Sequence, residues 1–120
     1  MTATPAGIPD ALALVVGKLV AAGLAASHTV GGLQVPGAWV HATGYQPITL
    51  GRTARLTVAV DLIAEDHDET IALTQLDQML GQALTAVTPS GEVETDVAVD
   101  FSSGSLPAFR IPTTIDYLKE

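Results

Sequence analysis

Residues 54–64 alternate between large apolar side chains and smaller or polar ones, and this pattern restricts the fold more than any other feature of the chain. The two sets are Leu56, Val58, Val60 and Leu62 on one side of an extended chain, and Arg55, Thr57, Ala59 and Asp61 on the other. Successive side chains of a strand point to opposite faces of a sheet. The alternation therefore predicts a strand with one buried face.

A helical pattern follows this strand after a short polar connection. Apolar residues then recur at steps of three and four, in the series Leu73, Leu76, Leu80, Leu84 and Val87. This spacing places them on one side of an α-helix. We expect an amphipathic helix that packs this row of side chains against the sheet.

The connection itself is strongly acidic. It reads Glu65, Asp66, His67, Asp68 and Glu69. Carboxylates and imidazole are metal ligands, but neighbouring residues of an extended chain point to opposite sides, and the run lacks the glycine of a calcium loop. We predict no metal site and expect Asp66 or Asp68 to cap the helix, with Glu69 near its positive end. A metal site and an exposed contact loop remain the alternatives.

The rest of the chain completes a single domain of residues 1–120. The expected elements are a flexible lead-in at 1–7, a helix at 11–26, a short strand at 38–42, a hairpin tip or longer excursion at 44–51, and strands at 93–101 and 109–117. Strands in sets with short connections favour antiparallel pairing. The predicted class is α+β, in the order α-β-β(-β)-α-β-β, with two helices packed against a mostly antiparallel sheet of four to five strands.

The first helix is apolar on nearly every side. Its stretch is too short for a membrane span of roughly 20 residues, and Lys18 lies near its middle. A helix of this kind must be covered on more than one side, so we expect contact with its own sheet and with a second chain, and a core made entirely within the chain is the alternative. The candidate interface residues are Leu12, Val16, Leu19, Trp39, Tyr45, Ile48, Arg52 and Arg55.

The composition also favours contact with other subunits. Charged residues make up 15% of the chain and apolar residues 48%, whereas charged residues make up about 25% of typical globular domains. Such a chain has a largely neutral surface, which is typical of subunits that cover one another. A net charge of -8 disfavours tight binding to nucleic acid.

No catalytic motif is present in the sequence, and we predict neither enzymatic activity nor a cofactor. His41 alternates with Trp39 in a strand and is expected to be packed or at a rim rather than to act as a base. Asp61 falls on the outer side of its strand together with Arg55. We expect Asp61 to be solvated or paired across a subunit boundary.

With this element order, the chain resembles the tail terminator proteins of long-tailed phages, especially those of actinobacteria. The segments that carry the likeness are PDALALVVGKLVAAG, VPGAWV, TVAVDLIAEDHDETIALTQLDQML and PAFRIPTTIDYL. The resemblance implies a hexameric ring that ends polymerisation of the tail tube and meets the head connector, with DNA only passing through its lumen. It also implies assembly in the host cytoplasm and a place at the head-proximal end of the virion tail. The acidic run at 65–69 has no role in that pattern.

Two other classes of protein stay open from the sequence alone. One is another head-tail connector or tail-completion protein, which would differ in stoichiometry and partner. The other is a small metal-dependent enzyme, and only the acids around His67 support it.

Overall fold

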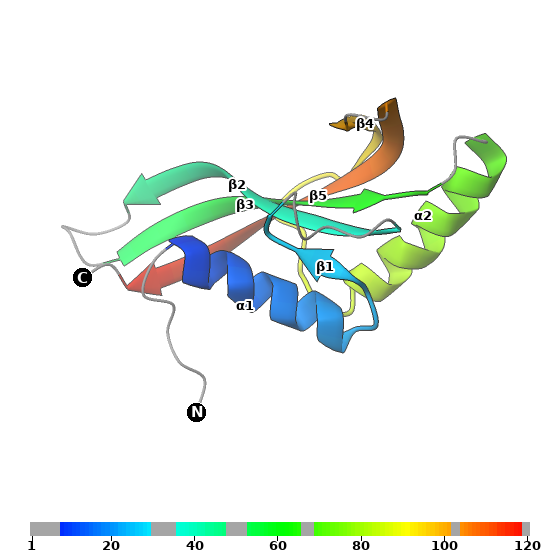
Figure 1. Cartoon of the computed structure of the whole chain (residues 1–120). Coiled ribbons are helices and arrows are strands. Elements are labelled where there is room, and N and C mark those ends of the chain that lie inside the picture. The colour runs from blue at the N-terminus through cyan, green and yellow to red at the C-terminus, as the bar shows by residue number, and fades with distance from the viewer. Residues whose placement is uncertain (1–7, 30–35, 48–52, 66–68, 102–103, 119–120) are drawn as a thin grey trace.

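The computed structural model describes residues 8–29, 36–47, 53–65, 69–101 and 104–118. Its elements are α1 (Ile8–Ala21), β1 (Ala26–Ser27), β2 (Gly37–Pro47), β3 (Thr53–Ile63), α2 (Glu69–Ala83), β4 (Glu94–Phe101) and β5 (Gly104–Leu118). The strands form one five-stranded sheet in the order β1-β2-β3-β5-β4, and α1 and α2 share one hydrophobic core with it (Figure 1). The predicted α+β class is confirmed.

The centre of the sheet is β3, which pairs with neighbours along its whole length. It is antiparallel to β2 from Gly37↔Ile63 to Pro47↔Ala54 and antiparallel to β5 from Thr53↔Leu118 to Ile63↔Ala108. The predicted alternation holds, because its large apolar residues face the helices. These residues are Leu56, Val58, Val60 and Leu62, all in the main core.

The opposite side of β3 is buried as well over its second half, so the prediction of only one buried face is wrong for that part. Ala59, Asp61 and Ile63 are at most 2% exposed. A second, smaller hydrophobic cluster of Ile63, Val99 and Ala108 covers this end of the sheet. It forms where the β4–β5 hairpin curves away from the helices (Figure 1).

Helix α1 ends earlier than the expected residue 26 because Gly23 terminates it. Gly23 has a positive φ of 99°, a conformation that glycine adopts without a steric penalty. Its N–H donates to the carbonyl of Val20 and the N–H of Leu24 donates to that of Leu19. These two bonds form a Schellman motif. The chain then runs into β1, a two-residue strand parallel to β2, which the sequence does not predict.

Helix α2 turns a different row of side chains to the sheet from the one predicted. The buried residues are Ala72, Leu76, Met79 and Ala83. Leu76 is buried as expected, but Leu73 and Leu84 are 45% and 44% exposed. The small side chains of Ala72 and Ala83 face the sheet, and this rotates the two leucines outward.

The two strands that flank β3 are β2 and β5, and both are longer than the sequence predicts. β5 buries alternate residues, namely Phe109, Ile111 and Thr113, on the face that contacts the core. β2 continues to Pro47 beyond the expected residue 42, with a bulge between Ala42 and Gly44. The segment expected as a hairpin tip or excursion therefore begins as strand. Among the described residues no helix is long and apolar enough to cross a membrane.

Candidate interaction surface and the buried Asp61 cluster

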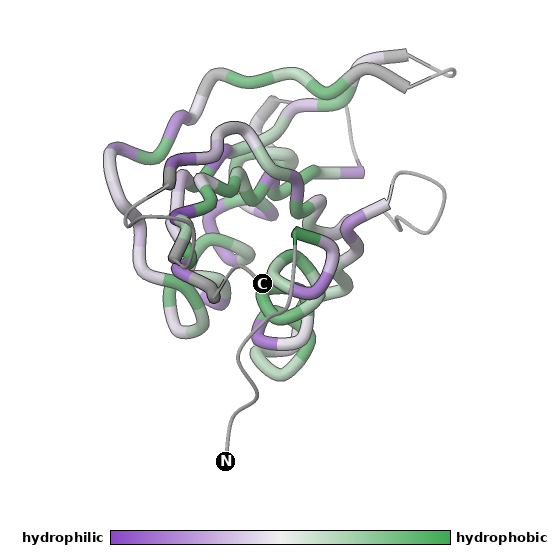
Figure 2. Tube along the Cα trace, turned by 90° about the vertical axis from the view of Figure 1, so that its left-hand side faces the viewer, coloured by the Kyte–Doolittle hydropathy of each residue, from purple (hydrophilic) through white to green (hydrophobic). Residues whose placement is uncertain are grey.

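Both helices expose large apolar side chains to solvent. On α1 these are Ile8 and Val20, on α2 they are Ile71 and Leu73, and Leu84 directly follows α2, with exposures between 38% and 55%. Hydrophobic residues run through the helices as well as the strands in Figure 2. Single exposed apolar residues are ordinary in soluble proteins, and the ones on the two helices are candidate positions for contact with a partner.

The predicted interface residues of α1 differ in how deeply the structure buries them. Leu19 is 0% exposed and lies in the chain's own core, so its assignment to an interface is wrong. The cause is the Ala11–Val15–Leu19 spacing, which places these residues together on the side of α1 that faces the sheet. Leu12 and Val16 are only partly buried and pack at the edge of the core.

The remaining predicted interface residues lie on strands. Tyr45 is 43% exposed on β2, and Trp39 is partly buried against the small cluster. Arg55 is exposed and its Nε donates to Asp116 Oδ1 at 2.9 Å. Ile48 and Arg52 lie outside the described residues.

The most constrained polar group on the sheet is the carboxylate of Asp61, which is 0% exposed. Arg110 on β5 donates from Nε to Oδ1 at 2.7 Å and from Nη2 to Oδ2 at 3.1 Å. His41 Nε2 on β2 lies 2.9 Å from Oδ2. The prediction that Asp61 is solvated or paired with another subunit is wrong, because residues of its own chain surround it.

Electrostatics keep this buried carboxyl ionised. Burial by itself would raise the pKa of Asp61, but the hydrogen bonds and charges of His41 and Arg110 outweigh it and hold that pKa below its ordinary value. The hydrogen bond to Asp61 likewise raises the pKa of Arg110. An ionised carboxylate only accepts hydrogen bonds, so the proton between His41 and Asp61 belongs to Nε2 of the imidazole.

Trp39 completes the cluster. Its ring stacks on the His41 ring with centroids 4.0 Å apart and an interplanar angle of 23°. Trp39 is opposite Asp61 in the β2–β3 register. The His41 imidazole therefore contacts the Trp39 ring with its face and the Asp61 carboxylate with its Nε2 atom. The arrangement joins β2, β3 and β5.

The described residues include no group of three or more His, Asp or Glu that could hold a metal ion. The acids proposed to cap α2, Asp66 and Asp68, lie with His67 outside them. β3 does end at Ile63 and α2 does begin at Glu69, so the acidic run stands between strand and helix as expected.

Comparison with known proteins returns no relative. The chain matches no protein-family model, no curated protein and no solved structure.

Proposed function

We propose that this protein is a non-enzymatic structural subunit that caps a phage tail tube as a homo-oligomeric ring, a hexamer in its complete form. The ring ends polymerisation of the tube and joins the tail to the head connector. The protein then resides at the head-proximal end of the tail after assembly in the host cytoplasm. The observation that carries this proposal is the set of exposed apolar side chains on α1 and α2, in a chain with only 15% charged residues.

These side chains favour an assembly over a free monomer. Each of Val20, Ile71, Leu73 and Leu84 leaves 44% or more of its area in water, and covering apolar area stabilises contacts by about 25 cal/mol per Å². Subunits of a ring meet through heterologous contacts, in which one surface binds a different surface of the neighbour. Exposed residues on two separate helices are suited to that arrangement.

The segments that resemble tail terminators also form the framework of the fold. PDALALVVGKLVAAG supplies nearly all of α1, and TVAVDLIAEDHDETIALTQLDQML supplies most of β3 and most of α2. VPGAWV leads into β2, and PAFRIPTTIDYL supplies most of β5. The likeness therefore extends over both the helical layer and the centre of the sheet.

Ending a tube requires binding and no chemistry. A ring that matches the last tube subunits on one face and differs on the other prevents further addition, because heterologous stacking otherwise continues without limit. A net charge of -8 suits a channel through which DNA passes, since like charges keep the phosphate backbone from binding.

The test is tail assembly in the absence of this protein. Overlong tubes, or tails that do not join heads, are the expected result. Resupplying the purified protein should restore tails of normal length that attach to heads. Tails of normal length that attach to heads without it would contradict the proposal.

A further inference from the structure

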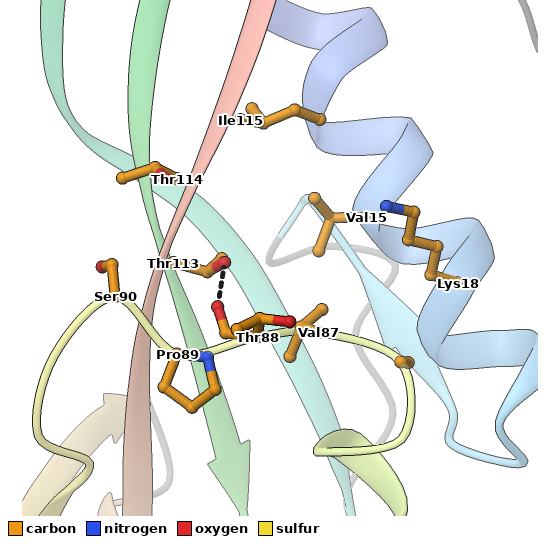
Figure 3. A pocket seen from close by; sticks show the side chains of 10 residues that line it. Val15, Lys18, Val87, Thr88, Pro89, Ser90, Thr113, Thr114 and Ile115 are labelled. Carbon is orange, nitrogen blue, oxygen red and sulfur yellow. Dashed lines mark hydrogen bonds between the residues drawn. The ribbon is translucent and has the colours of Figure 1, made fainter.

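A groove of about 300 Å³ lies between α1, the segment that follows α2 and strand β5 (Figure 3). Its apolar part includes Val15, Val87 and Ile115, and its polar part includes Lys18, Ser90 and Thr114. Thr113 closes the base, because its hydroxyl donates to the Thr88 carbonyl at 2.8 Å. The side chain of Lys18 extends along α1 with its amine on the groove side (Figure 3).

Lys18 differs from the other described basic residues in having no carboxylate partner. Arg55 is paired with Asp116 and Arg110 with Asp61, whereas no hydrogen bond or ion pair joins Lys18 to any residue of the described ranges. Its position in the last turn of α1 is favourable for a cation. Lys18 is exposed, and its three N–H donors have no acceptor among the described residues.

Some exposed acidic residues likewise form no ion pair with a described basic residue. Glu92 is exposed and stands in the irregular segment before β4, where it lines an open cleft with Glu94. No described basic residue forms an ion pair with Glu92. Of the other exposed acids, Asp10 and Asp77 lie on helices, and Glu65 is tied to α2 because its N–H donates to Gln75 Oε1 at 2.9 Å. A side chain outside regular structure is better able to project into a neighbour's groove.

We propose that this groove is one half of a seam between two copies of the chain, in which Lys18 of one copy binds the Glu92 carboxylate of the next. The proposal rests on the ring proposed above and names the charged contact of its subunit interface. The amine supplies the charge, and the hydroxyls of Ser90 and Thr114 supply further donors beside it. Val15, Val87 and Ile115 exclude water from one side of the contact.

Charge exchange between the two positions tests the seam. K18E and E92K each place like charges opposite one another, and we expect each to weaken self-association by about tenfold per interface. The double variant K18E/E92K restores opposite charges and should regain wild-type association. K18E/D77K has the same net charge as wild type but changes an acid on α2 instead, so it should remain defective. Sedimentation velocity of the free proteins and with purified tail tubes measures association, and circular dichroism verifies folding.

The outcomes separate this seam from the function it serves. Association that is unchanged in both single variants, or restored equally by both double variants, would overturn the Lys18–Glu92 contact while the ring itself stands. A wild-type chain that stays monomeric at high concentration and does not bind tail tubes would overturn the ring and the seam together.

Discussion

Asp61 on β3 and Arg110 on β5 are directly opposite in the strand register and are joined by two hydrogen bonds of 2.7 and 3.1 Å. This pair lies on the side of the sheet that carries no helix. A carboxylate with no exposed area in that position is stable only because an arginine and a histidine of the flanking strands satisfy it. The cluster therefore fixes β3 against both of its neighbours.

Replacing Asp61 by alanine should destabilise the fold by about 3 kcal/mol, because it leaves Arg110 without its partner and removes three hydrogen bonds. Urea unfolding followed by circular dichroism measures the loss. The control is Asp116→Ala, which removes an ion pair whose side chains are 46% and 50% exposed and should change stability little. Equal effects of the two substitutions would show that the buried cluster is not special.

The free energy of unfolding should decrease at acidic pH because Asp61 becomes protonated. Because the folded pKa of Asp61 is lowered, its stabilising contribution is fully present above the unfolded aspartate pKa of about 3.9 and is lost as the pH falls through the folded pKa. In Asp61→Asn this contribution is absent. The free energy of unfolding of this variant should therefore decrease less between neutral and acidic pH than that of wild type. An equal decrease in the two proteins would contradict the assignment.

The emission of Trp39 should be blue-shifted relative to free indole, because the ring is partly buried and stacked on His41. His41→Leu removes both the stack and one hydrogen bond to Asp61, and it should cost about 1–2 kcal/mol. The fluorescence of the native protein reports loss of the stack, since Trp39 is the only tryptophan in the sequence. Emission like that of free indole, or quenching on addition of a nucleotide, would indicate an open ligand-stacking face instead.

The exposed leucines on α2 and directly after it, Leu73 and Leu84, should contribute to association more than to folding. Leu73→Asp and Leu84→Asp are expected to weaken self-association at nearly wild-type stability, because both side chains are more than 40% exposed. Leu76→Ala is the contrast, since Leu76 is 1% exposed and its truncation should cost roughly 2–5 kcal/mol of stability. Light scattering and urea unfolding distinguish the two effects. Unfolding of the Leu73 and Leu84 variants would place these residues in the core.

The acidic run at 65–69 should not bind metal ions. Calorimetric titration with Ca²⁺, Mn²⁺ and Zn²⁺ is expected to give no site tighter than about micromolar, which corresponds to a binding free energy of about -8 kcal/mol. The reason is the spacing of its ligands, which suits helix capping better than chelation. A stoichiometric isotherm that His67→Ala abolishes would establish a metal site.

Much of the fold could be predicted from the sequence because it depends on local periodicity. The alternation in residues 54–64 determined β3 and its helix-facing side chains, and the alternation around Ile111 determined the buried face of β5. Gly23 also carries a local signal, because a glycine after an apolar helix commonly marks its end. These features follow from bond geometry and side-chain spacing, which act between near neighbours in the chain.

Only the tertiary structure decided what covers each face. The sequence assigns Asp61 to the outer side of a strand, but its burial depends on β2, on β5 and on the β4–β5 hairpin that closes the second cluster. The rotation of α2 that exposes Leu73 and the burial of Leu19 were settled in the same way. Burial is the sum of contacts between elements far apart in the sequence, and a pattern within one element does not contain that sum.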